Sequence, residues 1–338
     1  MGFKLSKAQF DAFLKEIGKE CEVYAPVCFQ GGGTYSDTDL VRYGKISSID
    51  EIVFDKKSAY SFKEVINPIC QTLFFFTEEE VKVADAPRKK GAVIFLRSCD
   101  LHALKRMDDM YLKNGPTDFY YSRMRENTKF ILMPCSSSFE NCFCASMGTN
   151  KSDNYDMSVE IKDGEVLADC KDDGFAKILS GVGAQAQAVS PSYVKESDVS
   201  VTLPDNLTND VIKSKMWDEY DSRCINCGRC TLVCPTCTCY TMQDIFYTDN
   251  GKVGERRRVA ASCMVDGFTD VAGGGSYRKT NGQRMRFKVL HKIHDFKARS
   301  GYDMCVGCGR CDMVCPEYIS FSNIINKVAE AGKEAGDE

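Results

Sequence analysis

Histidine is scarce in this sequence, with three among 338 residues, and long apolar runs are missing. So few imidazoles argue against a zinc or non-haem iron site built on histidine. No apolar run approaches the ~18 residues that a membrane-spanning helix needs. The first ten residues alternate polar and apolar instead of forming a secretion signal. We therefore expect a cytoplasmic protein without a membrane partner. The net charge of −4 gives no indication of a nucleic-acid partner.

Cysteine, in contrast, is abundant, with nineteen residues in the chain. Because nothing indicates export to an oxidising compartment, these cysteines are expected to be reduced thiols or metal ligands, not a disulfide framework. The hydrophobic and charged fractions, 43% and 27%, are ordinary for a globular protein. The length is sufficient for two domains with cores of their own.

Eight of the cysteines form two runs with one spacing, C-x-x-C-x-x-C-x-x-x-C-P, which is the spacing of bacterial two-cluster ferredoxins. In such proteins the first three thiolates of a run share one loop, and the fourth ligates the other cluster. We therefore predict two 4Fe–4S clusters. The predicted ligands are Cys224, Cys227, Cys230 and Cys315 for cluster 1, and Cys305, Cys308, Cys311 and Cys234 for cluster 2.

Structural zinc is the alternative reading of these runs. Zinc sites usually draw their ligands from two separated pairs. Four cysteines within eleven residues, duplicated and each followed by Pro235 or Pro316, fit a cubane cluster better. Each proline also ends the local helix and removes a backbone donor where the chain turns. A zinc-stabilised interaction protein remains as an alternative that metal analysis would decide.

The N-terminal half has the pattern of an α/β domain. Residues 92–96 and 130–133 are continuous apolar runs, typical of strands buried on both faces, and residues 101–112 between them have a helical pattern. This order predicts a mainly parallel sheet. Further expected elements are a helix over 6–19 with a capping box, a strand over 22–29, a short helix over 61–66, core positions at 74–76, a hairpin after 153 and a helix over 174–187.

Four more cysteines, Cys99, Cys135, Cys142 and Cys144, lie near the ends of these two predicted strands. Cys99 and Cys135 come just past the carboxyl ends, at the edge where open α/β sheets bind ligands. If all four thiolates converge, they would suit a soft metal ion or a third iron–sulfur cluster. Buried free thiols are the alternative, and the C-x-C spacing of Cys142 and Cys144 is not the usual spacing of a cubane.

The predicted domains are an α/β domain at 1–189, a polar linker at 190–210, a mostly helical two-cluster ferredoxin-like domain at 211–325 and a flexible tail at 326–338. Helices are expected at 242–247 and 286–299, in the spacer between the cysteine runs. Cys237, Cys239 and Cys263 also lie there and could pack beside the clusters or tune them. The basic residues 256–258 and the basic stretch 278–299 are either solvated, or dock an acidic partner, or raise the cluster potentials.

Residues 222–237 and 305–316 resemble the iron–sulfur subunit of anaerobic sulfite reductases and the related beta subunit of cytosolic sulfhydrogenases. The likeness extends to SDTDLVRYG at 36–44, RSCDL at 97–101 and CFCASMGT at 142–149, so it covers most of the chain. It implies an electron-transfer role in a cytoplasmic, anaerobic, NADH-dependent sulfite reductase, an oxidoreductase complex. One partner would carry flavin and oxidise NADH, and another would carry sirohaem and reduce sulfite to sulfide.

In that role the chain would relay electrons and would have no catalytic site of its own. The alternative that the same resemblance implies is the beta-type electron-transfer subunit of a cytosolic hydrogenase or of a heterodisulfide-type reductase.

Overall fold

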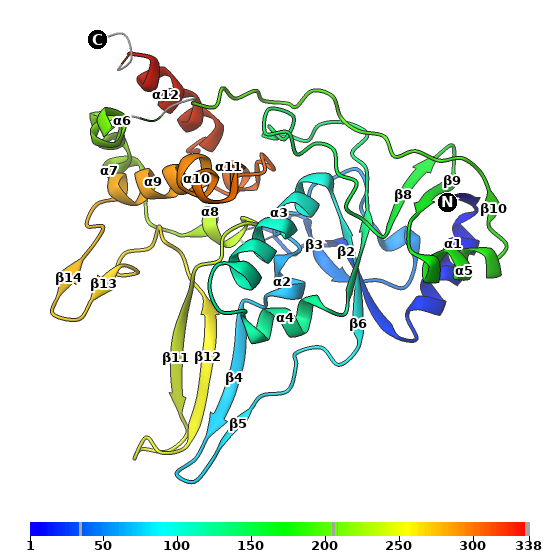
Figure 1. Cartoon of the computed structure of the whole chain (residues 1–338), viewed down its shortest axis with the longest axis horizontal. Coiled ribbons are helices and arrows are strands. Elements are labelled where there is room, and N and C mark those ends of the chain that lie inside the picture. The colour runs from blue at the N-terminus through cyan, green and yellow to red at the C-terminus, as the bar shows by residue number, and fades with distance from the viewer. Residues whose placement is uncertain (34–35, 205–206, 208, 335–338) are drawn as a thin grey trace. The chain divides into compact units, whose positions relative to one another are not determined.

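The structure is a computed structural model that describes residues 1–33, 36–204, 207 and 209–334. The described residues form two compact units, and each unit is assembled from separate segments of the chain (Figure 1). The first unit comprises Met1–Pro68, Asp85–Phe139 and Thr149–Glu196, and the second comprises Ile69–Ala84, Glu140–Gly148 and Ser197–Glu338. Two segments of the predicted domain 1–189 therefore belong to the second unit. Among the described residues, no helix is long and apolar enough to cross a membrane.

An eight-stranded sheet forms the centre of the first unit, in the order β10-β1-β9-β8-β7-β6-β2-β3. Its four parallel strands are β2 (Cys21–Phe29), β6 (Gly91–Leu96), β7 (Thr128–Leu132) and β8 (Met157–Lys162). The antiparallel additions are β3 (Leu40–Lys45), β9 (Glu165–Cys170), β1 (Gly2–Leu5) and β10 (Gln185–Ala186). The sheet is therefore mixed, and the prediction of a mainly parallel sheet holds only for its centre. The two continuous apolar runs are in that centre, where residues 92–96 are fully buried.

The helices of the first unit follow their sequence signals. Helix α1 (Lys7–Ile17) begins at Ser6 with the predicted capping box to Gln9, and it buries Phe10, Phe13, Leu14 and Ile17 on the sheet. Helix α3 (Ser98–Asp108) starts directly after β6 and continues as the π-helical turn η2 (Asp109–Lys113). The others are η1 (Ile49–Glu51), α2 (Lys63–Ile66), α4 (Phe119–Arg125) and α5 (Asp173–Gly181), which is shorter than predicted because the chain enters β10.

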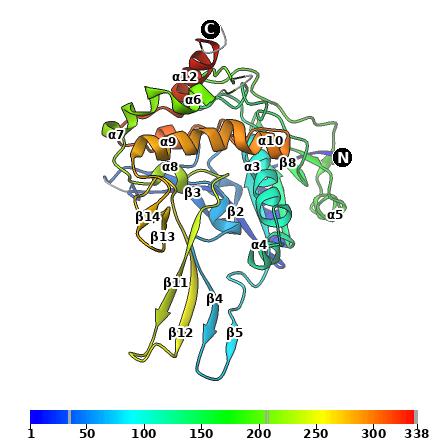
Figure 2. The same ribbon diagram turned by 60° about the vertical axis from the view of Figure 1, so that its left-hand side comes forward.

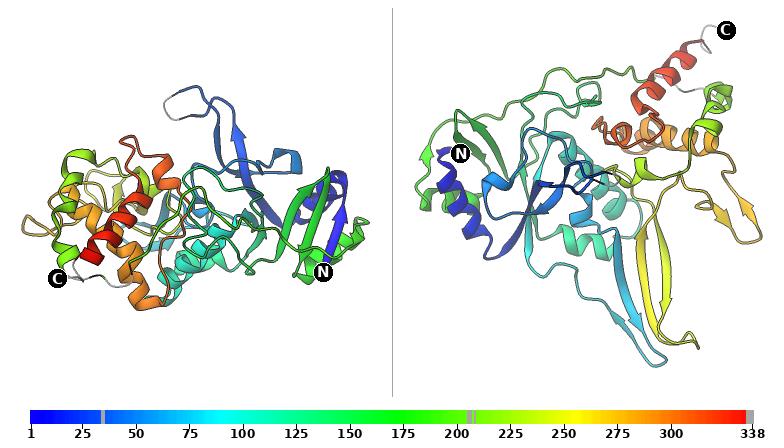
Figure 3. Two further views of the ribbon diagram at one scale, coloured as in Figure 1. Left: turned by 90° about the horizontal axis from the view of Figure 1, so that it is seen from above. Right: turned by 180° about the vertical axis from the view of Figure 1, so that it is seen from behind.

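The second unit contains a four-stranded sheet that sequence reasoning did not anticipate. Its order is β11-β12-β4-β5, with β4 (Cys70–Phe76), β5 (Val81–Val83), β11 (Tyr240–Phe246) and β12 (Gly254–Ala260), and the view from behind shows β4 beside β12 as well (Figure 3). The predicted helix at 242–247 is wrong, because these residues pair along β12 over the length of β11. Phe75 is 42% exposed, so the predicted core at 74–76 is also wrong there; Leu73 is the buried residue.

Helices form the rest of the second unit. The predicted helix at 286–299 is confirmed as α9 (Asn281–Leu290), the π-helical turn η4 (His291–Asp295) and α10 (Phe296–Ser300), which follow one another along one line (Figure 2). The shorter elements are α6 (Asn209–Lys213), η3 (Lys215–Trp217), α7 (Glu219–Arg223), α8 (Arg229–Leu232), α11 (Arg310–Met313) and the hairpin β13 (Asp270–Val271) and β14 (Gly275–Ser276).

Helix α12 (Phe321–Glu334) runs through most of the segment in which a flexible tail was expected, and residues 335–338 of that segment lie outside the described residues. The expected linker at 190–210 is irregular over residues 190–204 and at 207, whereas residues 209–210 begin α6. Residues 205–206 and 208 lie outside the description. The helical core centres on Trp217, Met285, Val289 and Ile325. Since the unit combines these helices with a sheet, a mostly helical character is not confirmed.

Candidate metal centres

The two cysteine runs adopt matched backbone conformations in the second unit. Each loop has two left-handed residues, Asn226 and Gly228 in the first run and Gly307 and Gly309 in the second. The later glycine of each pair begins a short helix, α8 after Gly228 (φ 72) and α11 after Gly309 (φ 67). A left-handed glycine lets the chain turn sharply, so that the first three cysteines of a run share one loop. The repeat in the sequence is thus a repeat of local structure.

One cavity lies at the first run, with an empty volume of about 480 Å³. We call it the first cavity. It is lined by the four predicted ligands of cluster 1, Cys224, Cys227, Cys230 and Cys315. Cys311, a predicted ligand of cluster 2, lines it as well. Apolar side chains, Met264, Met285 and Ile324 among them, make up much of the remaining wall.

The second cavity lies at the second run, with an empty volume of about 370 Å³. It is lined by the four predicted ligands of cluster 2, Cys305, Cys308, Cys311 and Cys234. Cys230, a predicted ligand of cluster 1, lines it as well. Each cavity therefore gathers the first three thiols of one run and two thiols of the other run, one of which is that run's fourth cysteine. That exchange of the fourth cysteine is the arrangement of two-cluster ferredoxins.

Backbone amides and polar side chains surround the thiol sulfurs. The amide of Ile319 donates to Cys315 Sγ at 3.3 Å, and the amide of Gly307 donates to Cys305 Sγ at 3.5 Å. Lys292 Nζ donates to Cys234 Sγ at 3.5 Å. Donors of this kind stabilise sulfur that carries negative charge, as the thiolate ligands of a cluster do. The donor set and the cavities therefore fit 4Fe–4S clusters.

Burial has a large effect on the titration of these thiols. Burial raises the pKa of Cys305 to about 12 and raises the pKa of Cys311 well above its ordinary value. Burial by itself would lower the pKa of Lys288, but the neighbouring sulfurs of Cys230 and Cys311 raise it. Without a metal the thiols of Cys305 and Cys311 would stay protonated at neutral pH, so cluster assembly must displace their protons.

The four cysteines of the predicted third site belong to different parts of the fold. Cys99 lies in the first turn of α3 and Cys135 follows β7, both in the first unit. Cys142 and Cys144 belong to the second unit, where Cys142 Sγ donates to the carbonyl of Cys308 at 3.5 Å and Cys144 Sγ lies 3.6 Å from Ser197 Oγ. A shared third metal site stays a prediction.

Cys237 and Cys263 are buried in the second unit, and Cys239 is partly buried beside the same core. The adjacent thiol of Cys239 raises the pKa of Cys263, and burial raises it further. The thiol of Cys234 and burial raise the pKa of Cys237 in the same way. Cys239 and Cys263 thus belong to the same core as Cys224 and Cys230, and packing beside the clusters or tuning them stays a prediction.

Sequence reasoning missed several contributors to the cavities, among them Phe143, Lys288 and Lys292. Phe143 and Lys292 line the second cavity, and Lys288 lines both. Phe143 is far from the runs in sequence, and cysteine spacing carries no signal for it. Lys288 and Lys292 were included only as members of the basic stretch 278–299.

Comparison with known proteins agrees with this geometry. Residues 223–319 match the 4Fe–4S dicluster domain family. The chain is also 32% identical over 352 residues to sulfhydrogenase 2 subunit beta of Pyrococcus furiosus, a match that covers 97% of this chain and 98% of the relative. The prediction of 4Fe–4S clusters is therefore confirmed, whereas the assignment of individual ligands stays a prediction. The chain belongs to the sulfhydrogenase beta-subunit family, as an iron–sulfur subunit that transfers electrons.

Proposed function

We propose that this chain is the electron relay of a cytoplasmic oxidoreductase complex of the hydrogenase type. The observation that supports it most directly is the shared wall of the two cavities, formed by Cys230, Cys311, Lys288 and Phe321. Clusters held in cavities with a common wall would be close neighbours. A bound 4Fe–4S cluster takes up and releases one electron at a time. The residues of this chain would hold two such clusters side by side and shield them from water.

The proposed ligands are those predicted from the sequence: Cys224, Cys227, Cys230 and Cys315 for cluster 1, and Cys305, Cys308, Cys311 and Cys234 for cluster 2. The contents of the two cavities support this division. In the proposed complex, the chain contributes thiolate ligation, burial and hydrogen bonds to sulfur, which are the means by which a protein sets a cluster potential. The bond-making chemistry would take place on partner subunits.

Two identities of the complex compete. The match to the sulfhydrogenase subunit over 97% of the chain supports a hydrogenase-type complex. A sulfite reductase, with a flavin subunit that oxidises NADH and a sirohaem subunit that reduces sulfite, is the second candidate. Its support is the likeness of residues 36–44, 97–101 and 142–149 to the iron–sulfur subunit of anaerobic sulfite reductases.

Purification from the source organism under strictly anaerobic conditions tests both parts of this proposal. We expect a brown protein with about eight iron atoms per chain, the content of two cubanes, together with a nickel-containing partner protein. A sirohaem-containing partner would replace the first candidate by the second. Zinc in place of iron would contradict the relay function altogether. About twelve iron atoms per chain would support a third cubane at Cys99, Cys135, Cys142 and Cys144.

A further inference from the structure

Two buried lysines lie on the helical segment behind the cavities. Lys288, near the end of α9, is 6% exposed, and Lys292, in the π-helical turn η4, is 4% exposed. Lysine is almost never buried to this extent unless a group of opposite charge lies next to it, because burial removes water from the ammonium group. The structure must therefore supply a negative charge to each of them.

The predicted cluster ligands would supply this charge, because they bind a cluster as thiolates. Cys230 and Cys311 line both cavities together with Lys288, and Cys234 lines the second cavity together with Lys292. Lys292 Nζ donates to Cys234 Sγ at 3.5 Å and to Thr236 Oγ1 at 2.6 Å. Lys288 Nζ lies 5.1 Å from the centre of the Phe321 ring, the aromatic side chain in the shared wall. Both ammonium groups thus face the predicted cluster ligands.

The two lysines differ in which cavity they line. Lys288 lines both cavities, whereas Lys292 lines only the second. The backbone fixes the position of Lys292, because its carbonyl accepts hydrogen bonds from the amides of Met304 at 2.9 Å and Cys305 at 3.1 Å. The helix that carries Lys292 is therefore bonded to the first cysteine of the second run. A π-helical turn at this point fits the frequent occurrence of such turns at functional sites.

We propose that Lys288 and Lys292 set the reduction potentials of the clusters, Lys288 for both clusters and Lys292 for cluster 2. This inference rests on the proposed relay function and ligand sets. Reduction adds one electron, and so one negative charge, to a cluster that its thiolates already make anionic. A buried ammonium group stabilises the added charge more strongly than an exposed one, because solvent screens it less. Each lysine thereby raises the potential of the cluster that it faces.

The test is an anaerobic redox titration of the full-length chain with its iron bound, followed by EPR spectroscopy. In Lys292→Met, the midpoint potential of one cluster should fall by at least 59 mV. For a one-electron couple, this fall is a tenfold rise in the ratio of oxidised to reduced cluster at a fixed potential. The other cluster should stay unchanged. In Lys288→Met, both midpoint potentials should fall. Lys288→Arg and Lys292→Arg keep the charge and should stay near the wild-type potentials.

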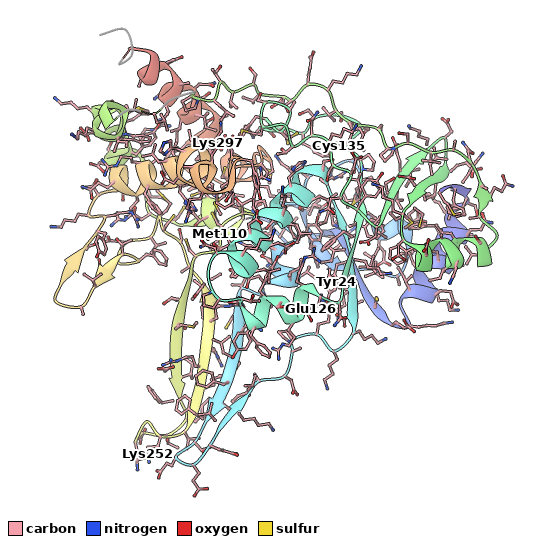
Figure 4. The ribbon with its side chains drawn as sticks, in the orientation of Figure 1. Tyr24, Met110, Glu126, Cys135, Lys252 and Lys297 are labelled. Carbon is pink, nitrogen blue, oxygen red and sulfur yellow. The ribbon has the colours of Figure 1, made fainter. Side chains whose placement is uncertain are left out.

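Lys297→Met is the matched control. Lys297 lies on α10 of the same helical line, is exposed to solvent and is labelled in Figure 4. Its removal should leave both potentials unchanged. The cluster that Lys292→Met affects is identified by the EPR signal that Cys308→Ser alters.

Unshifted potentials in the two methionine variants, with full iron content, would overturn the proposal. So would a shift of both potentials in Lys292→Met alone. Should Lys292→Met lose its cluster, Lys292→Gln keeps a hydrogen-bond donor without the charge, and an unshifted potential in that variant would overturn the proposal equally. A wild-type chain without iron would instead refute the relay function itself, before any lysine is changed.

Discussion

The backbone amide of Phe143 donates a 2.8 Å hydrogen bond to the carbonyl of Gly307, in the loop of the second cysteine run. This bond joins two segments of the second unit that are far apart in sequence. The contact is close on both sides. A Cβ added to Gly307 would lie 2.6 Å from the Phe143 carbonyl oxygen, and one added to Gly309 would lie 2.1 Å from the Asn141 carbonyl oxygen. Residues 141–143 therefore form part of the support of the second loop.

The first prediction concerns Gly309. Its φ of 67° is in the left-handed region, and its added Cβ would clash with a backbone carbonyl that has little freedom to move. We expect Gly309→Ala to destabilise the holoprotein by about 3 kcal/mol, the sum of the conformational strain and the overpacking. The measurement is anaerobic urea unfolding followed through the visible absorption of the clusters.

Gly301→Ala separates the two contributions. Gly301 has a φ of 81°, but an added Cβ there meets nothing within 4 Å. It should therefore cost only about 1 kcal/mol, the strain alone. Equal losses of stability in the two variants would show that the contact with Asn141 contributes nothing.

The sequence predicted the cavities better than it predicted the elements around them. Cysteine spacing is local information, and the four thiols predicted for each cluster line one cavity together with one further cysteine. The pairing of β11 with β12, and of β12 with β4, depends on partners far away in the chain, so residues 242–247 were assigned to a helix. The support of Gly307 by Phe143 was missed for the same reason.

Lys288 and Lys292 show a different limit of sequence reasoning. A basic stretch normally lies on the surface, because lysine is mostly exposed. Whether a particular lysine turns inward depends on which anions the fold places there. Here the second unit places the sulfurs of Cys230 and Cys234 next to them, and spacing along one helix carries no information about that.

The second prediction tests the exchange of the fourth cysteine between the runs. Because Cys227 and Cys315 line the same cavity, Cys227→Ser and Cys315→Ser should alter the same EPR signal. Cys308→Ser and Cys234→Ser should alter the other signal. Each change should remove up to about four iron atoms per chain, the content of one cubane, and each should slow electron transfer through the assembled complex.

Cys28→Ser is the control for these variants, since Cys28 is an exposed cysteine of the first unit. It should leave both signals and the iron content unchanged. If Cys315→Ser altered the same signal as Cys308→Ser, each run would hold its own cluster and the exchange would be refuted.

The third prediction is a loss of stability in weak acid. His102 on α3 lies with Nε2 2.7 Å from the carbonyl oxygen of Lys151, and burial lowers the pKa of its imidazole below the ordinary value of about 6.5. Between the lowered pKa and 6.5, the unfolded chain binds more protons than the folded chain does. Stability therefore falls as the pH decreases through this window and is fully present above it.

The measurement compares the urea midpoint at pH 7 and pH 5 for the wild type and for His102→Gln. Glutamine can still donate to the Lys151 carbonyl but does not titrate. The variant should lose less stability between the two pH values than the wild type does. A loss of the same size would assign the acid sensitivity to other groups, such as His291, whose pKa burial lowers to about 4.

The fourth prediction concerns Asp312, a carboxylate in the wall of the first cavity. Its Oδ1 accepts the amide of Phe321 at 2.9 Å, and its Oδ2 accepts the hydroxyl of Ser320 at 3.2 Å, so the negative charge is fixed in place. A fixed negative charge opposes the addition of an electron to a neighbouring cluster. Asp312→Asn should therefore raise the midpoint potential of cluster 1, the opposite direction to the effect of removing Lys288.

Glu317→Gln is the matched comparison, because it removes the same charge from the same cavity. Glu317, however, is exposed to solvent. Water and salt screen an exposed carboxylate, so its removal should shift the potential less than the change at Asp312 does. Both potentials are read from EPR-monitored redox titrations under identical salt. Equal shifts in the two variants would mean that net charge alone controls cluster 1. No shift in Asp312→Asn would mean that its carboxylate is screened from the cluster, and the prediction for Asp312 would then fail.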